Sequence, residues 1–147
     1  MTSGPTEDRA GRSVPPTALR RRATLLAVIG AGGAIGAAAR YGAGLAIPPH
    51  LDAFPVATFL VNVVGAVILG AVAALPTDWL SAHELTRPAI GTGFCGGLTT
   101  FSTFSAEIVT LLQQGRMVWA CAAVAAHLFG SLLMTFAGIG TVAWLKS

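Results

Sequence analysis

Four apolar segments limit what this chain can fold into more than any other feature. They are Ala23–Ala39, Val56–Leu75, Pro88–Leu112 and Met117–Leu145, and Glu107 is the only Asp, Glu, Lys or Arg inside them. A helix of about 20 apolar residues crosses the roughly 30 Å hydrocarbon core of a bilayer. Backbone inside lipid must satisfy its own hydrogen bonds, which favours helices. The pattern predicts an all-α membrane protein with four transmembrane helices.

Composition supports this class of protein and separates the N-terminal end from the rest. Charged residues make up 10% of the 147-residue chain, whereas soluble domains carry about 25%. Five of the nine Lys and Arg residues lie in residues 1–22, which are otherwise rich in Pro, Ser and Thr. We therefore expect a disordered Arg-rich tail over 1–22 and a membrane domain over 23–147. The triple Arg could also begin a signal peptide, but three further apolar segments favour a true span.

The stretch GTGFCGGLTTFSTFS, residues 91–105, begins with a G-x-G-x-x-G pattern. A dinucleotide fingerprint needs a preceding strand, a following helix and an acidic residue about 20 positions later. Here a polar loop ending in Pro88 precedes the glycines, and the only downstream acid, Glu107, comes too early. The pattern lies inside a membrane-length apolar segment, so we expect no nucleotide site.

Two interpretations of these glycines remain open. In the first, Gly91, Gly93 and Gly97 let neighbouring helices approach closely. In the second, the adjacent Gly96 and Gly97, followed by two β-branched threonines, interrupt the helix. An interruption frees carbonyl oxygens, and a small hard cation coordinated by backbone oxygens would satisfy them.

Two groups of side chains likewise allow either a packing role or a functional role. Phe101 and Phe104 share a helix face, where they either pack or turn their electropositive ring edges toward a small anion. Asn62 lies mid-span with Thr58 one turn before it. Its amide either forms an interhelical hydrogen bond or donates to an anion in a pathway.

A polar stripe of His127, Ser131 and Thr135 follows the last segment at i, i+4 and i+8. Glu107 either pairs with Arg40 or Arg116, or acts as the proton-coupling group of a transporter. The chain has no G-x-S-x-G, no HExxH and no paired carboxylates. We therefore do not expect an enzyme.

Motifs in three segments together resemble a known family. GGAIGAAARY in the first segment, TFLVNVVG in the second and GFCGGLTTFSTFS in the third are similar to the small bacterial fluoride channels of the Fluc family. The resemblance covers roughly residues 23–144. It implies a passive, fluoride-specific channel in the inner (plasma) membrane, with no nucleic-acid partner. It also implies an antiparallel dual-topology homodimer with two pores, in which the third helix is broken mid-membrane.

The resemblance further implies roles for individual residues. The backbone carbonyls of Gly96 and Thr99 would hold a structural Na⁺ at the dimer centre. The fluoride pore would be lined by Asn62, Phe101, Phe104, Thr58, Ser131 and Thr135. The chain departs from the family at His127, where many relatives have a Tyr, and in its Arg-rich tail.

A four-span proton-coupled exporter of small solutes is the alternative function. Such exporters usually place a membrane carboxylate in the first span, and Ala23–Ala39 contains none.

Overall fold

A computed structural model describes residues 16–47, 54–76 and 84–147, and within these ranges the regular elements are all helices. Two long helices are followed by a segment divided into shorter helices and then by a third long helix. The elements in chain order are α1 (Pro16–Ala46), α2 (Val56–Ala73), the π-helix η1 (Pro88–Cys95), α4 (Gly96–Leu98), α5 (Ser102–Gln113) and α6 (Met117–Leu145).

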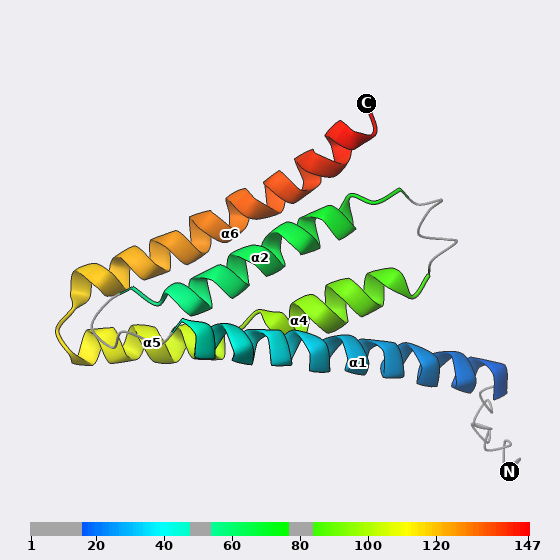
Figure 1. Cartoon of the computed structure of the whole chain (residues 1–147), viewed down its shortest axis with the longest axis horizontal. Helices are drawn as coiled ribbons and strands as arrows, with labels where there is room; N and C mark the ends of the chain where they lie inside the picture. The colour runs from blue at the N-terminus through cyan, green and yellow to red at the C-terminus, as the bar shows by residue number, and fades with distance from the viewer. Residues whose placement is uncertain (1–15, 48–53, 77–83) are drawn as a thin grey trace, which may run out of the picture.

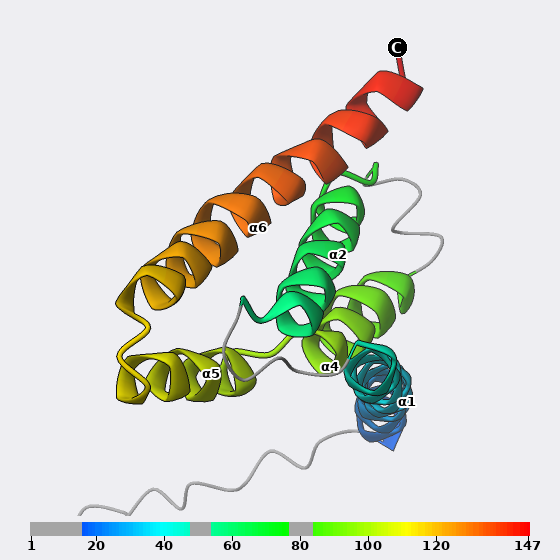
Figure 2. The same ribbon diagram turned by 60° about the vertical axis from the view of Figure 1, so that its left-hand side comes forward.

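The helices are arranged side by side so that the chain passes back and forth (Figure 1). α2 and α6 run in one direction, whereas α1 and the succession η1–α4–α5 run in the other. The start of α1 and the end of α6 therefore lie at the same end of the molecule (Figure 1). Figure 2 shows α1 beneath η1–α4, with α6 on the far side of α2.

Three of the four expected spans are single helices. Thr17–Ala46, Val56–Ala73 and Met117–Leu145 are long and apolar enough to cross a membrane. The segment expected over Pro88–Leu112 is instead divided, because Thr99 takes an extended conformation with φ −76° and ψ 158°. The next helix, α5, begins only at Ser102.

The start of α1 differs from the expected boundary between tail and domain. Residues 16–22 are helical, although we placed them in a disordered tail. The sequence PTALRRR explains the difference, since Pro suits the first turn of a helix and Ala, Leu and Arg are strong helix formers. The rest of the expected tail, 1–15, lies outside the described residues.

Glycines bring α1 into backbone contact with η1 and α4. A Cβ added at Gly36 would meet the carbonyl oxygen of Phe94, and one at Gly93 would fall 2.7 Å from the carbonyl oxygen of Ile29. A Cβ at Gly97 would likewise strike the backbone of Gly33. The packing role expected for Gly93 and Gly97 is confirmed, and we call this contact the α1 glycine seam.

A second glycine contact joins α2 to α6. A Cβ at Gly70 would strike the backbone of Thr135, and one at Gly138 would fall 2.8 Å from the amide nitrogen of Ala71. Gly91 differs from these positions, since its nearest neighbour is a side-chain carbon of Leu69 at the ordinary distance of 3.6 Å.

Candidate functional site: an open groove at the interrupted third segment

The interruption after α4 redirects two backbone N–H groups. In a continuous helix, the amides of Thr100 and Thr103 would bond the carbonyls of Gly96 and Thr99. Here the Thr100 amide donates to Asn62 Oδ1 at 2.8 Å, and the Thr103 amide donates to Thr100 Oγ1 at 3.2 Å. The carbonyl oxygens of Gly96 and Thr99 are thereby released from their helical donors.

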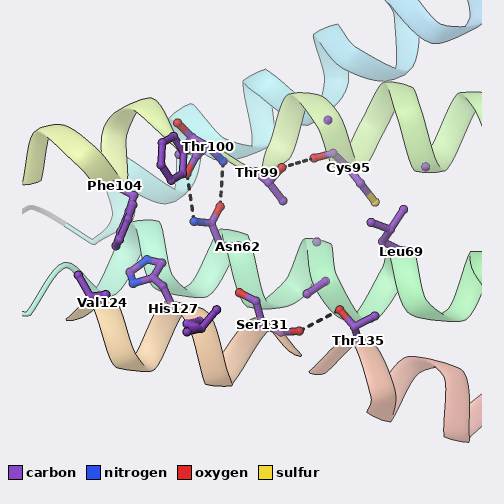
Figure 3. A pocket seen from close by; sticks show the side chains of 16 residues that line it. Asn62, Leu69, Cys95, Thr99, Thr100, Phe104, Val124, His127, Ser131 and Thr135 are labelled. Carbon is purple, nitrogen blue, oxygen red and sulfur yellow. Dashed lines mark hydrogen bonds between the residues drawn. The ribbon is translucent and has the colours of Figure 1, made fainter. Parts of the chain in front are cut away.

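Asn62 of α2 holds the interruption from both sides. Its Oδ1 accepts from the Thr100 amide, and its Nδ2 donates to the Thr100 carbonyl at 3.1 Å (Figure 3). The interhelical hydrogen bond that we considered for Asn62 is therefore present. A carboxamide carries two N–H bonds, and Thr100 takes one of them, so the other is left for another acceptor.

We call the two bonds between Asn62 and Thr100 the Asn62 clamp. An open groove of about 660 Å³ lies beside it. Helices α2 and α6 supply one wall, and the divided segment supplies the other (Figure 3). Of the site residues expected from sequence, all but Thr58 line it: Asn62, Gly96, Thr99, Phe101, Phe104, Ser131 and Thr135. Among the described residues that line the groove there is no Asp, Glu, Lys or Arg.

Thr58 belongs to a second pocket of about 550 Å³ between α1, α2 and the divided segment. Its hydroxyl donates to Glu107 Oε1 at 2.8 Å. Arg40, which also lines this pocket, donates from Nε to the carbonyl of Gly97 at 3.1 Å. Of the two arginines considered as partners for Glu107, Arg40 is thus bonded to α4 backbone instead of to this carboxylate.

An aromatic cluster closes one end of the groove. The ring centroids of Phe101 and Phe104 are 5.8 Å apart, and Phe104 lies 4.6 Å from the His127 ring. Phe101 is 79% exposed although it lines the groove, whereas His127 is 7% exposed. Sequence reasoning left His127 out of the expected site; its position in the polar stripe of the last segment was the available signal.

The α6 hydroxyls differ in what they offer to the groove. Thr135 donates its hydroxyl to the carbonyl of Ser131 at 2.9 Å, so this proton is used within the helix. Ser131 has no such bond among the described residues, so its hydroxyl can serve a ligand in the groove.

The groove has the chemistry to hold a small anion weakly. It is lined by the Asn62 amide, the Ser131 hydroxyl and the rings of Phe101 and Phe104. N–H groups, O–H groups and aromatic ring edges carry partial positive charge without a formal one. A Lys or Arg side chain in direct contact with an anion would slow its release, and neither occurs among the described residues that line the groove.

Comparison with known proteins finds a family model and curated relatives that match most of the chain. Residues 27–139 match the profile of a family described as CrcB-like protein, Camphor Resistance (CrcB). A protein of Pseudomonas aeruginosa (strain UCBPP-PA14), named fluoride-specific ion channel FluC, is 47% identical over 117 residues, which are 80% of this chain and 92% of the relative. A protein of the same name from Chromobacterium violaceum is 49% identical over 118 residues, covering 80% and 94%. Another, from Nitrosomonas europaea, is 44% identical over 119 residues, covering 81% and 94%.

Proposed function

The chain belongs to the CrcB-like family, and from this membership we propose that it is a fluoride-specific ion channel. Its relatives are named as ion channels and not as enzymes. The observation that carries the proposal is the groove, where seven of the eight expected site residues meet and where the described lining residues include no Asp, Glu, Lys or Arg. The proposed function is passive export: fluoride enters a cell as neutral HF, dissociates, and leaves as the anion driven by the membrane potential.

The groove residues address the main barrier to fluoride permeation, which is loss of the ion's tightly held water. The free N–H of Asn62 and the Ser131 hydroxyl would replace water as donors, and the edges of Phe101 and Phe104 would add weak positive potential. Thr58, in the adjoining pocket, would extend the hydrophilic route toward the groove.

We further propose that the working unit is an antiparallel, dual-topology homodimer in the inner membrane, with two pores. The groove of one chain is open, and Phe101 on its wall is 79% exposed. A second copy related by two-fold symmetry would cover this wall and complete the path. The lipid bilayer would cover the remaining exposed apolar side chains of α1 and α6.

The released carbonyls of Gly96 and Thr99 suit a structural Na⁺, since small hard cations prefer oxygen ligands. Gly96 is exposed and has no atom within 4 Å of a Cβ position, so a cation and a second copy could approach it. No cluster of three or more His, Cys, Asp or Glu occurs in the described ranges, so backbone oxygens are the natural ligands there. When bound, the cation would supply a fixed positive charge near the pore.

Fluoride release from liposomes tests the proposed function. Vesicles loaded with potassium fluoride or potassium chloride and carrying purified protein should release fluoride only, once a potassium ionophore removes the opposing voltage. Phe104→Leu should slow release at least about tenfold, which corresponds to loss of roughly 1.4 kcal/mol of pore stabilisation. The control Phe129→Leu, an exposed α6 side chain that does not line the groove, should leave release unchanged. Equal release of both anions, or of neither, would contradict the proposal.

The proton-coupled exporter predicts a different result in the same vesicles. Its fluoride release would require a pH gradient and would stop when the gradient is collapsed. Release that persists at equal pH on both sides identifies a channel.

A further inference from the structure

Two buried side-chain atoms in the described ranges have no hydrogen-bond partner: Glu107 Oε2 and His127 Nε2. They come from α5 and α6, and the ring of Phe104, one turn before Glu107 on α5, lies 4.6 Å from the His127 ring. A buried polar atom without a partner is costly, and two such atoms on contacting helices suggest one shared component. The proposed pore does not use either atom.

The hydrogen bonds around these groups determine what each orphaned atom can do. His127 Nδ1 lies 2.8 Å from the carbonyl oxygen of Ala123. Since a carbonyl only accepts, the ring proton is on Nδ1, and Nε2 of a neutral ring is an acceptor. Glu107 Oε1 already accepts from Thr58, and Oε2 of the carboxylate is a further acceptor. Two acceptors cannot bond each other.

Among the described residues, the aromatic side chains around the imidazole supply no donor to it. Its ring neighbours are Phe54, Phe59 and Phe104, at centroid distances of 6.3, 5.4 and 4.6 Å. None of these rings has an N–H or O–H group.

The charged and titratable groups from the other packed elements are few. From α1, Arg40 and Tyr41 line the pocket that contains Glu107, and the Arg40 Nε is bonded to Gly97. From the divided segment, Cys95 lines the groove that contains His127. From α2, the neighbour is the uncharged Thr58, whose hydroxyl proton is already used.

We propose that Glu107 and His127 together form a binding site for one proton. The proton comes from water and resides either on Nε2, giving an imidazolium beside a carboxylate, or on Oε2, giving a carboxylic acid beside a neutral imidazole. In both forms one orphaned acceptor becomes a donor, and the pair has no net charge. Loss of the proton leaves one negative charge in this part of the molecule.

This site has a consequence for transport that rests on the proposed function. His127 lines the groove and its ring lies 4.6 Å from Phe104. A net negative charge there repels fluoride, so the protonated pair is the conducting form. Fluoride flux therefore falls as pH rises through the titration of the pair, about tenfold for each pH unit beyond the midpoint.

Counting protons tests the site without any transport. Potentiometric titration of the purified protein between roughly pH 5 and 8 should show about one proton per subunit more in the wild type than in His127→Gln. Glu107→Gln should remove the same proton and serves if the first variant does not fold. Thr141→Ala, an exposed α6 position, is the matched control and should titrate as the wild type does. A proton count equal to that of the wild type in either folded variant would overturn the proposal.

Fluoride release at equal pH on both sides, corrected for protein-free vesicles, gives the second measurement. The wild type should lose flux as the pH rises, and His127→Gln should show a flat profile. A His127→Gln profile that still falls like the wild type would overturn the link to flux. If the wild type releases no fluoride but still binds one proton more than the two variants, the proposed function is wrong and the proton site is still supported.

Discussion

Two adjacent glycines, Gly96 and Gly97, differ in the space available around them. A Cβ at Gly97 would fall 2.9 Å from the carbonyl carbon of Gly33 and nearer still to its oxygen. A Cβ at Gly96 would have no atom within 4 Å. Gly97 belongs to the α1 glycine seam, where the absence of a side chain allows two backbones to touch. Gly96 belongs to the interruption, where its carbonyl is freed from its helical donor.

The contrast shows that one short motif serves two structural purposes. In the seam, close backbone contact holds the divided segment against α1. In the interruption, polar backbone is exposed and needs partners, which Asn62 supplies in part. The seam therefore provides the rigid support, and the interruption provides the chemistry.

Among the changes that test the difference between the seam and the interruption, removal of the Asn62 clamp should have the largest effect on stability and fluoride release. Asn62→Leu leaves both backbone groups of Thr100 without their partner, at a cost of about 1–3 kcal/mol each. We expect a marked loss of thermal stability in detergent and no measurable fluoride release. Val64→Leu, an exposed position on the same helix, should behave as the wild type does. A stable and active Asn62→Leu protein would mean that the clamp does not hold the interruption.

Paired alanine substitutions at the two glycines come next in expected effect. Gly97→Ala forces a methyl group against the backbone of Gly33, which overpacking data value at about 1–3 kcal/mol. Gly96→Ala meets open space and should leave the stability of the single chain within about 0.5 kcal/mol of the wild type. Unfolding of both variants in a denaturing detergent, monitored by circular dichroism, measures the difference. Equal destabilisation by Gly96→Ala and Gly97→Ala would contradict the proposed difference between the seam and the interruption.

Exchange of sodium has the smallest expected effect. If the carbonyls of Gly96 and Thr99 hold Na⁺, sodium at about ten times its dissociation constant stabilises the protein by about 1.4 kcal/mol. Replacing Na⁺ with the bulky cation N-methyl-D-glucamine, inside and outside the vesicles, should lower thermal stability and slow fluoride release. Unchanged stability and release after complete exchange would count against a cation at the interruption.

Sequence reasoning predicted the parts of the fold that depend on local pattern. The apolar segments gave the helices α1, α2 and α6, because a long uncharged run allows few other structures. The start of α1 at Pro16 was missed, since the polarity of residues 16–22 outweighed their helix propensity in our reading.

Seven of the eight residues that the resemblance suggested for the site line one groove, whereas their hydrogen-bond partners could not be predicted from the sequence. The clamp joins Asn62 to Thr100, and the bond that places Thr58 in the second pocket joins it to Glu107. These partners lie 38 and 49 residues apart, and no local pattern specifies which distant residues meet. The orphaned Nε2 of His127 depends on a bond to its own helix and on aromatic neighbours from other helices, so it became visible only in three dimensions.

The reversal potential of the protein in a planar bilayer tests the central claim most directly. With fluoride on both sides in a tenfold gradient, a fluoride-selective channel should reverse about 59 mV from zero, with the sign expected for an anion. Adding chloride to one side only should not move that value. A reversal potential near zero, or one that follows the chloride gradient, would contradict the account.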